Sequence, residues 1–155
     1  MNTLKIQIPE GFKVESFDEK SGTVKFAPLP KDIKERVKTI ADAISVLGEE
    51  DTDVIDYRKL SAASVADHIL GNQELVIIAK SLNEGWTPDW QNDEFDKWIN
   101  WFNMSSSSSG RFSFHYSDDQ YSSSGCGSRL CFKSKELAQY AASQFIDIYE
   151  KTFAI

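Results

Sequence analysis

The spacing of apolar residues changes at Pro88, and this change constrains the fold more than any other feature of the chain. Before Pro88, residues 31–47 and 72–85 carry apolar side chains at intervals of three and four, as amphipathic helices do. After it, three segments fit strands better, residues 97–102, 111–116 and 128–133. The sequence therefore predicts middle helices followed by a three-stranded antiparallel meander.

Two further elements are predicted at the ends of the chain. Residues 12–17 and 23–27 alternate around a turn in which Gly22 suits a β-hairpin. Residues 134–153 return to helical spacing behind Ser134, a favourable N-cap, and this helix is expected to pack on the meander. The predicted fold class is α+β. We expect a single domain over residues 1–155, with the hairpin and helices in 1–83 and the tryptophan-rich meander and terminal helix in 84–155.

All four tryptophans fall in the most acidic part of an acidic chain. The formal net charge is −7, and residues 84–120 hold seven acidic residues and two basic ones. Because nucleic-acid binding depends on Lys and Arg neutralising phosphates, this distribution disfavours a nucleic-acid partner. Two interpretations of the tryptophans stay open. They form the core of the C-terminal half, or they leave a partly exposed platform for a basic peptide, a sugar or a cationic ligand.

Two Ser/Gly-rich connections, residues 104–110 and 117–127, join the predicted strands. They serve either as solvated linkers or as adaptable recognition loops. Arginine is included among the candidate contacts because its guanidinium grips anions in a bidentate manner. The candidate ligand- or partner-binding residues are Trp86, Trp90, Trp101, Arg111, His115, Tyr121 and Arg129.

The residues with catalytic chemistry form no coherent set. The segment 115–119, HYSDD, matches no metal-ligand spacing. Cys126 and Cys131 flank Arg129, but a catalytic thiol also needs a positioned base, for which His115 is the nearby candidate. No glycine-rich phosphate loop is present. The sequence predicts no catalytic residue, cofactor or metal, and it favours a non-enzymatic role while leaving enzymatic turnover open.

The termini and the hydropathy bear on the cellular setting. The opening MNTLKIQIPEG lacks the pattern of a signal peptide, and no apolar run approaches the ~20 residues that span a bilayer. We therefore expect a soluble cytoplasmic protein, no membrane partner, and cysteines present as thiols rather than as a disulfide.

Three segments carry a resemblance to a known family. They are GSRLCFKSKELAQYAASQF (127–145), LNEGWTPDW (82–90) and the helix KERVKTIADAISVLG (34–48). They resemble a family of small uncharacterised proteins that is frequent in gut Bacteroides-type bacteria and in their phages and prophages. The resemblance implies a phage or prophage accessory protein of the bacterial cytoplasm or the virion. It carries over no catalytic residues.

Three functional hypotheses follow. The leading one is a non-enzymatic binding module for a host or virion protein, because the chain combines an aromatic, acidic stretch with polar loops. The second is a small-ligand binding protein, for a nucleotide-like molecule or a saccharide, and it leaves turnover of that ligand open. The third is a structural component of the virion. The sequence does not predict the oligomeric state.

Overall fold

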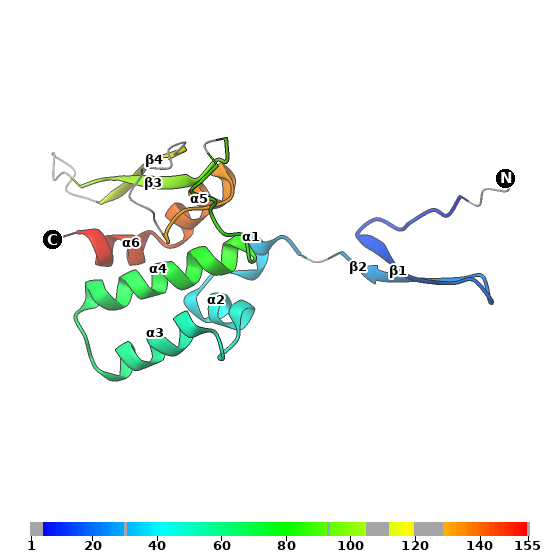
Figure 1. Cartoon of the computed structure of the whole chain (residues 1–155), viewed down its shortest axis with the longest axis horizontal. Helices are drawn as coiled ribbons and strands as arrows, with labels where there is room; N and C mark the ends of the chain where they lie inside the picture. Colours follow the sequence, from blue (N-terminus) through cyan, green and yellow to red (C-terminus); the bar gives the residue numbers. More distant parts are fainter. Residues whose placement is uncertain (1–4, 30, 93, 105–111, 120–128, 155) are drawn as a thin grey trace. The chain divides into compact units, whose positions relative to one another are not determined.

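The computed structural model describes residues 5–29, 31–92, 94–104, 112–119 and 129–154 (Figure 1). The chain divides into two compact units, residues 1–32 and 33–155. Within the described residues there are six helices and two antiparallel sheets of two strands each, so the predicted α+β class is confirmed. The expectation that residues 1–155 form a single domain stays a prediction.

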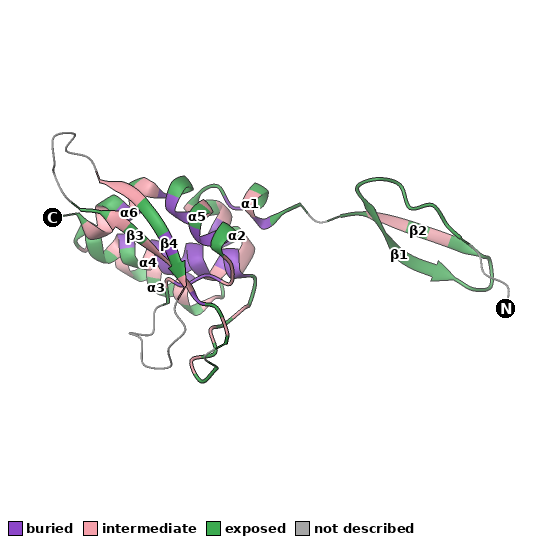
Figure 2. Cartoon of the chain, turned by 90° about the horizontal axis from the view of Figure 1, so that it is seen from above, coloured by how far each residue is buried: buried purple, intermediate pink, exposed green. Residues whose placement is uncertain are grey.

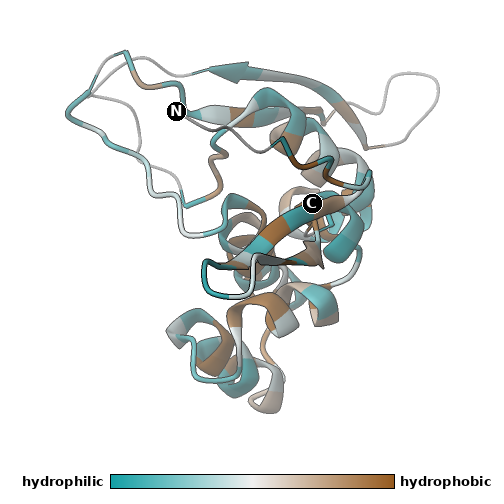
Figure 3. Cartoon of the chain, turned by 90° about the vertical axis from the view of Figure 1, so that its right-hand side faces the viewer, coloured by the Kyte–Doolittle hydropathy of each residue, from teal (hydrophilic) through white to brown (hydrophobic). Residues whose placement is uncertain are grey.

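The first unit is the predicted β-hairpin. Strands β1 (Phe12–Asp18) and β2 (Thr23–Pro28) pair antiparallel, and Gly22 adopts a φ of 65° in the turn between them. Hydrophobic and hydrophilic residues alternate over positions 12–15 and 23–26, and the register shifts between Val14 and Ser16 (Figure 3). Every described residue from 5 to 29 is exposed or half-buried within the structure (Figure 2).

The second unit is built around one long helix, α4 (Asp67–Asn83). Four other helices contact it, namely α2 (Ile40–Leu47), α3 (Thr52–Ala62), α5 (Lys135–Gln144) and α6 (Ile146–Phe153). Residues 74–79 of α4 are all buried, because neighbours cover the helix on more than one side (Figures 1 and 2). The short helix α1 (Ile33–Arg36) precedes α2, and strands β3 (Trp98–Asn103) and β4 (Ser113–Asp119) precede α5.

Two helices that the sequence predicted as continuous are each divided. In the segment 31–47, Thr39 starts α2 with a capping box. Its hydroxyl accepts the Asp42 N–H at 3.2 Å, and the Asp42 carboxylate accepts the Thr39 N–H at 2.9 Å. In the segment 134–153, Ser134 caps α5 as predicted, but Phe145 has a φ of −116° and separates α5 from α6. Apolar spacing continues across both breaks, which is why it did not predict them.

The central helix also differs from the prediction at its start. The sequence predicted a helix over residues 72–85, whereas α4 begins at Asp67 and Asn72 lies inside it. Gly71 is a close-approach position of this helix, because a Cβ there would collide with the hydroxyl of Thr152 in α6. The predicted end is confirmed, since Gly85 follows the helix with a φ of 82°.

The predicted three-stranded meander is wrong. Strands β3 and β4 pair antiparallel, but the described part of the third segment, residues 129–133, makes only an isolated bridge. In that bridge the backbones of Trp98 and Phe132 exchange two hydrogen bonds of 3.0 and 2.8 Å.

The other edge of this segment is bound by the buried side chain of Asn83. Its amide nitrogen donates to the carbonyl of Cys131 at 2.9 Å, and its oxygen accepts the N–H of Lys133 at 3.0 Å. Phe132 directs its N–H and carbonyl towards Trp98, whereas the carbonyl of Cys131 and the N–H of Lys133 face the opposite side, where the end of α4 binds them. We call residues 129–133 the Asn83-bound segment.

The β3–β4 sheet lies against α5 and α6 with one face. On that face Asn100 donates to the carbonyl of Ala138 at 2.8 Å and accepts from the hydroxyl of Ser117 at 2.7 Å. Phe102 packs on Tyr149 with their ring centroids 4.5 Å apart. The sheet is thereby attached to the helical part of the unit through both hydrogen bonds and aromatic contacts.

One hydrophobic core joins the helices before residue 83 to the segments after residue 130. Its fully buried members include Val37, Val54, Ile77, Ile78, Leu82, Phe132, Ala138 and Ala141. In the part of the chain that the structure describes, none of the helices has the length and apolar character needed to cross a membrane.

Candidate functional site

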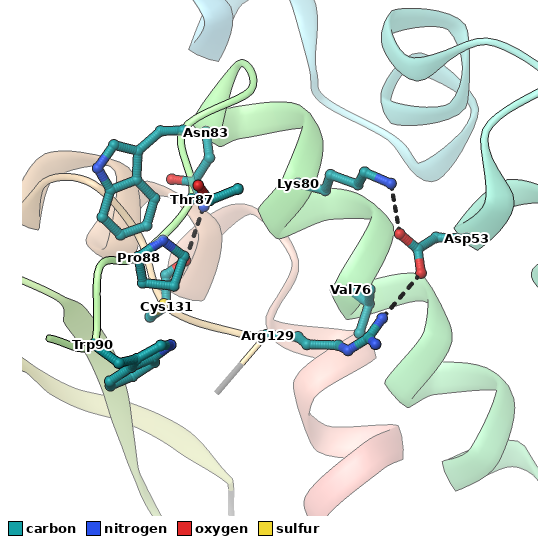
Figure 4. Close-up of a pocket in the computed structure, with 10 residues that line it drawn as sticks. Asp53, Val76, Lys80, Asn83, Thr87, Pro88, Trp90, Arg129 and Cys131 are labelled. Carbon is teal, nitrogen blue, oxygen red and sulfur yellow. Dashed lines mark hydrogen bonds and ion pairs between the residues drawn. The ribbon is translucent and has the colours of Figure 1, made fainter. Parts of the chain in front are cut away.

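A pocket with a volume of about 370 Å³ lies beside the C-terminal half of α4 (Figure 4). Its lining comes from four places in the sequence. Helix α4 contributes side chains at spacings of four and three, which place them on one face. The lining residues are Asp53 of α3, Val76, Lys80 and Asn83 of α4, Trp86, Thr87, Pro88 and Trp90 of the following loop, and Arg129 and Cys131 of the Asn83-bound segment. We call this cavity the Trp86–Trp90 pocket.

Trp86 and Trp90 form the aromatic wall of the pocket, and both rings contact residues outside the lining. Trp86 stacks on Phe95 with ring centroids 5.6 Å apart and planes 16° from parallel. The ammonium of Lys97 lies 5.4 Å from the centroid of the Trp90 ring and 5.6 Å from that of Phe95. Such cation–π contacts contribute more when the cation is removed from water. Both tryptophan rings are therefore held in place by residues that do not line the pocket.

Lys97 is an unusual residue, because its relative exposure is 0%. Its Nζ donates to the backbone carbonyls of Asn92 at 3.0 Å and of Phe95 at 2.8 Å. Among the described residues no carboxylate forms an ion pair with it. Lys97 was not among the residues predicted for the site. The available signal was that it is the only basic residue between positions 84 and 110.

The inner end of the pocket is formed by Asn83 and Cys131. Asn83 is 5% exposed and is joined to the Cys131 carbonyl by the hydrogen bond described above (Figure 4). Burial raises the pKa of the Cys131 thiol, although the backbone and the charge of Lys97 offset part of this effect. A raised pKa disfavours the thiolate, which is the nucleophilic form.

The outer rim is charged. Lys80 Nζ lies 2.9 Å from a carboxylate oxygen of Asp51 and 2.7 Å from one of Asp53. Burial opposes the charge of Asp51, but hydrogen bonds from Lys80 and from the Asp53 N–H bring its pKa below the usual value. Arg129 reaches the same Asp53 with Nη1 at 3.4 Å, and its side chain is 78% exposed (Figure 4).

The structure separates the predicted site residues into two groups. Trp86, Trp90 and Arg129 line the pocket. Trp101 and His115 lie instead on the β3–β4 sheet. Arg111 and Tyr121 lie outside the described residues.

The second group gathers on the side of the sheet that faces away from α5 and α6. Trp101 is 47% exposed and stacks on Tyr116 with ring centroids 6.1 Å apart and planes 12° from parallel. The register shifts between Trp101 and Phe102, which leaves His115 as the extra residue on β4. This bulge leaves two consecutive residues, His115 and Tyr116, both exposed. We call Trp101, His115 and Tyr116 the outer aromatic face.

The four tryptophans differ in burial. Trp86, Trp90 and Trp98 are half-buried, and Trp98 packs against the core together with its neighbour Phe102. Trp101 is exposed. That the exposed tryptophan surface binds a ligand or partner stays a prediction.

Neither a group of metal ligands among the described residues nor a comparison with known proteins assigns a function to the pocket. Within the described ranges, no three His, Cys, Asp or Glu side chains gather in a way that would hold a metal ion. No family model, curated protein or solved structure matches the chain. The resemblance to the family from Bacteroides-type bacteria and their phages stays a prediction.

Proposed function

We propose that this protein is a non-enzymatic binding module and that the Trp86–Trp90 pocket is its small-ligand site. The observation that carries the proposal is that residues far apart in the sequence line one cavity. Residues separated by up to 78 positions, from Asp53 to Cys131, meet around it. Its volume falls within the range of about 300–1,000 Å³ that is typical of small-molecule sites.

The composition of the pocket supports binding rather than catalysis. Two indole rings and a proline offer apolar surface, and a few polar groups stand at the rim, which is the usual pattern of a ligand site. The bracing of both rings by Phe95 and Lys97 favours affinity, because less freedom is lost when a ligand binds to a preformed wall. The buried thiol of Cys131, with its raised pKa, offers no activated nucleophile.

The test is an NMR titration of the full chain with a library of small aromatic and saccharide ligands. The four tryptophans give four indole N–H resonances, which single Trp→Phe variants assign. We expect binding to shift the resonances of Trp86 and Trp90 while Trp101 serves as an internal control on the outer aromatic face. A library in which no compound moves Trp86 or Trp90 would contradict the proposal.

A second candidate function, docking of a host or virion protein, is favoured by the outer aromatic face. Trp101 and Tyr116 expose 47% and 44% of their surface, and large aromatic side chains dominate the binding energy of many protein interfaces. A phage or prophage accessory protein of the bacterial cytoplasm or virion would use such a face.

Affinity capture from a host lysate tests the docking hypothesis. We compare the wild type with a Trp101→Ser/Tyr116→Ser double variant and with Trp90→Phe. Docking predicts a captured protein that the double variant loses and Trp90→Phe retains. A capture pattern that is identical for all three proteins would remove this candidate.

A further inference from the structure

We infer that the Trp86–Trp90 pocket takes a ligand that joins a flat ring to an anionic group, a carboxylate or a phosphate. This inference rests on the proposed function and narrows it to a chemical class. It follows from two features of the pocket. One is the aromatic wall, and the other is that Arg129 is largely exposed while Lys80 is held by two carboxylates.

The ring half of the ligand follows from the wall. Trp86, Pro88 and Trp90 line one side of the cavity, and flat apolar groups stack favourably on such surfaces. The Phe95 ring stacks on Trp86, and the Lys97 ammonium lies over the Trp90 ring, so both indoles have contacts that do not depend on a ligand. A planar ligand therefore meets a surface that is already formed.

The anionic half follows from Arg129. A guanidinium has five N–H donors, and within the described part of the chain Arg129 uses one of them, Nη1, in a long hydrogen bond of 3.4 Å to Asp53. Its side chain is 78% exposed, so the remaining donors face solvent at the rim of the pocket. Carboxylates and phosphates are the groups that bind guanidinium through two parallel hydrogen bonds.

Lys80 does not compete for this role. Its ammonium is already held by Asp51 at 2.9 Å and by Asp53 at 2.7 Å. These two contacts use two of the three N–H donors of the ammonium and neutralise its charge, so Lys80 attracts an incoming anion only weakly. They also fix Asp53, so that its carboxylate is shared between Lys80 and Arg129 and is a poor partner for an added cation.

The charges around the pocket also favour an anion, although the whole chain has a net charge of −7. Among the residues that line the cavity, two are cations, Lys80 and Arg129, and one is a carboxylate, Asp53. The nearby Asp89 does not line the cavity, and its carboxylate accepts the N–H of Gln91 at 2.9 Å. The local balance is one positive charge.

The experiment is isothermal titration calorimetry of the full chain with four naphthalene compounds that share one ring system. Two are anions, the carboxylate of 2-naphthaleneacetic acid and 2-naphthyl phosphate. The other two are the neutral 2-naphthylmethanol and the cationic 2-naphthylmethylamine. We expect at least one of the two anions to bind about tenfold more tightly than the alcohol, and the amine to bind most weakly. Comparison of the two anions distinguishes a carboxylate ligand from a phosphate ligand.

Two variants locate the effect. Arg129→Gln is expected to lower the affinity of the anions to that of the alcohol and to leave the affinity of the alcohol unchanged. Arg58→Gln removes the same charge from an exposed arginine of α3 that does not line the pocket, and it is expected to change none of the affinities.

The possible failures are distinguishable. If the alcohol binds as tightly as both anions, or the amine binds best, the inferred ligand class is wrong while the proposed binding function stands. If Arg129→Gln leaves the preference for anions intact, the role of Arg129 is wrong. If none of the four compounds binds, the pocket does not accept a flat ring, and both the inference and the proposed site are overturned.

Discussion

The side chain of Asn83 links the end of the central helix to the Asn83-bound segment, and its removal is expected to destabilise the protein strongly. Two hydrogen bonds, 2.9 Å to the Cys131 carbonyl and 3.0 Å from the Lys133 N–H, join positions 48 and 50 residues apart. Asn83 is 5% exposed, so water does not readily replace these bonds in an Asn83→Ala variant. The Cys131 carbonyl and the Lys133 N–H then each lose the hydrogen bond that Asn83 supplies.

The magnitude follows from this count. Each lost hydrogen bond is worth about 1 kcal/mol, and each buried group left unsatisfied costs about 1–3 kcal/mol before relaxation. Because Lys133 is only half-buried, its N–H recovers some hydration. We therefore expect Asn83→Ala to lower the free energy of unfolding by about 2–4 kcal/mol. With a urea m-value of about 2 kcal/mol per molar, the midpoint falls by roughly 1–2 M.

Urea unfolding followed by tryptophan emission measures this change, since all four tryptophans lie between residues 86 and 101. The matched control is Asn72→Ala, which makes the same substitution at an exposed position of the same helix. Alanine favours a helix, so the control is expected to be neutral or slightly stabilised. If Asn83→Ala and Asn72→Ala unfold at midpoints that agree within error, the bridging role assigned to Asn83 is refuted.

Three further predictions concern packing and ionisation. Gly71→Ala is expected to destabilise the protein by about 1–3 kcal/mol in urea unfolding, because the new methyl group meets Thr152, whereas helix propensity alone predicts a gain. Burial raises the pKa of Tyr149 to about 12, and burial together with the charge of Glu74 also raises the pKa of Tyr57. Absorbance at 295 nm should therefore show tyrosines that ionise above pH 10, and the stability contributed by Tyr149 should fall as the pH rises from 10 towards 12. Tyr149→Phe should reduce the latest absorbance step by one tyrosine, and a variant whose titration near pH 12 matches that of the wild type contradicts this. Burial opposes the charge of Asp51, but hydrogen bonds from Lys80 and the backbone lower its pKa. Its contribution to the free energy of unfolding is therefore present above the unfolded pKa of 3.8 and is lost as the pH falls through the lower folded pKa. Asp51→Asn keeps an oxygen that can cap α3, and it should flatten the acid side of the profile of stability against pH.

Much of the secondary structure could be predicted because it depends on local chemistry. The hairpin at residues 12–28 follows from alternation around Gly22, and the cap at Ser134 and the stop at Gly85 follow from side-chain and backbone preferences of single residues. Apolar spacing predicted the helices but not the breaks at Thr39 and Phe145. Both breaks preserve the apolar face, so the pattern continues through them.

The choice of partner for polar groups could not be predicted. The segment 128–133 has the spacing of a strand, but Asn83 satisfies two of its backbone groups from a helix 48 residues away. The inward position of Lys97 likewise depends on two loop carbonyls and two aromatic rings that only the folded loop brings together. From sequence, a lysine among acidic residues indicates a solvated charge.

The candidate site divides in the same way. The sequence by itself determined which residue types are available for binding, so Trp86, Trp90 and Arg129 were identified from the scarcity of tryptophan and the chemistry of arginine. Only the tertiary structure decided that these three meet Asp53 and Lys80 around one cavity while Trp101 and His115 lie on another surface. The physical reason is that side-chain chemistry belongs to each residue alone, whereas proximity depends on how α3, α4 and the Asn83-bound segment pack around a shared core.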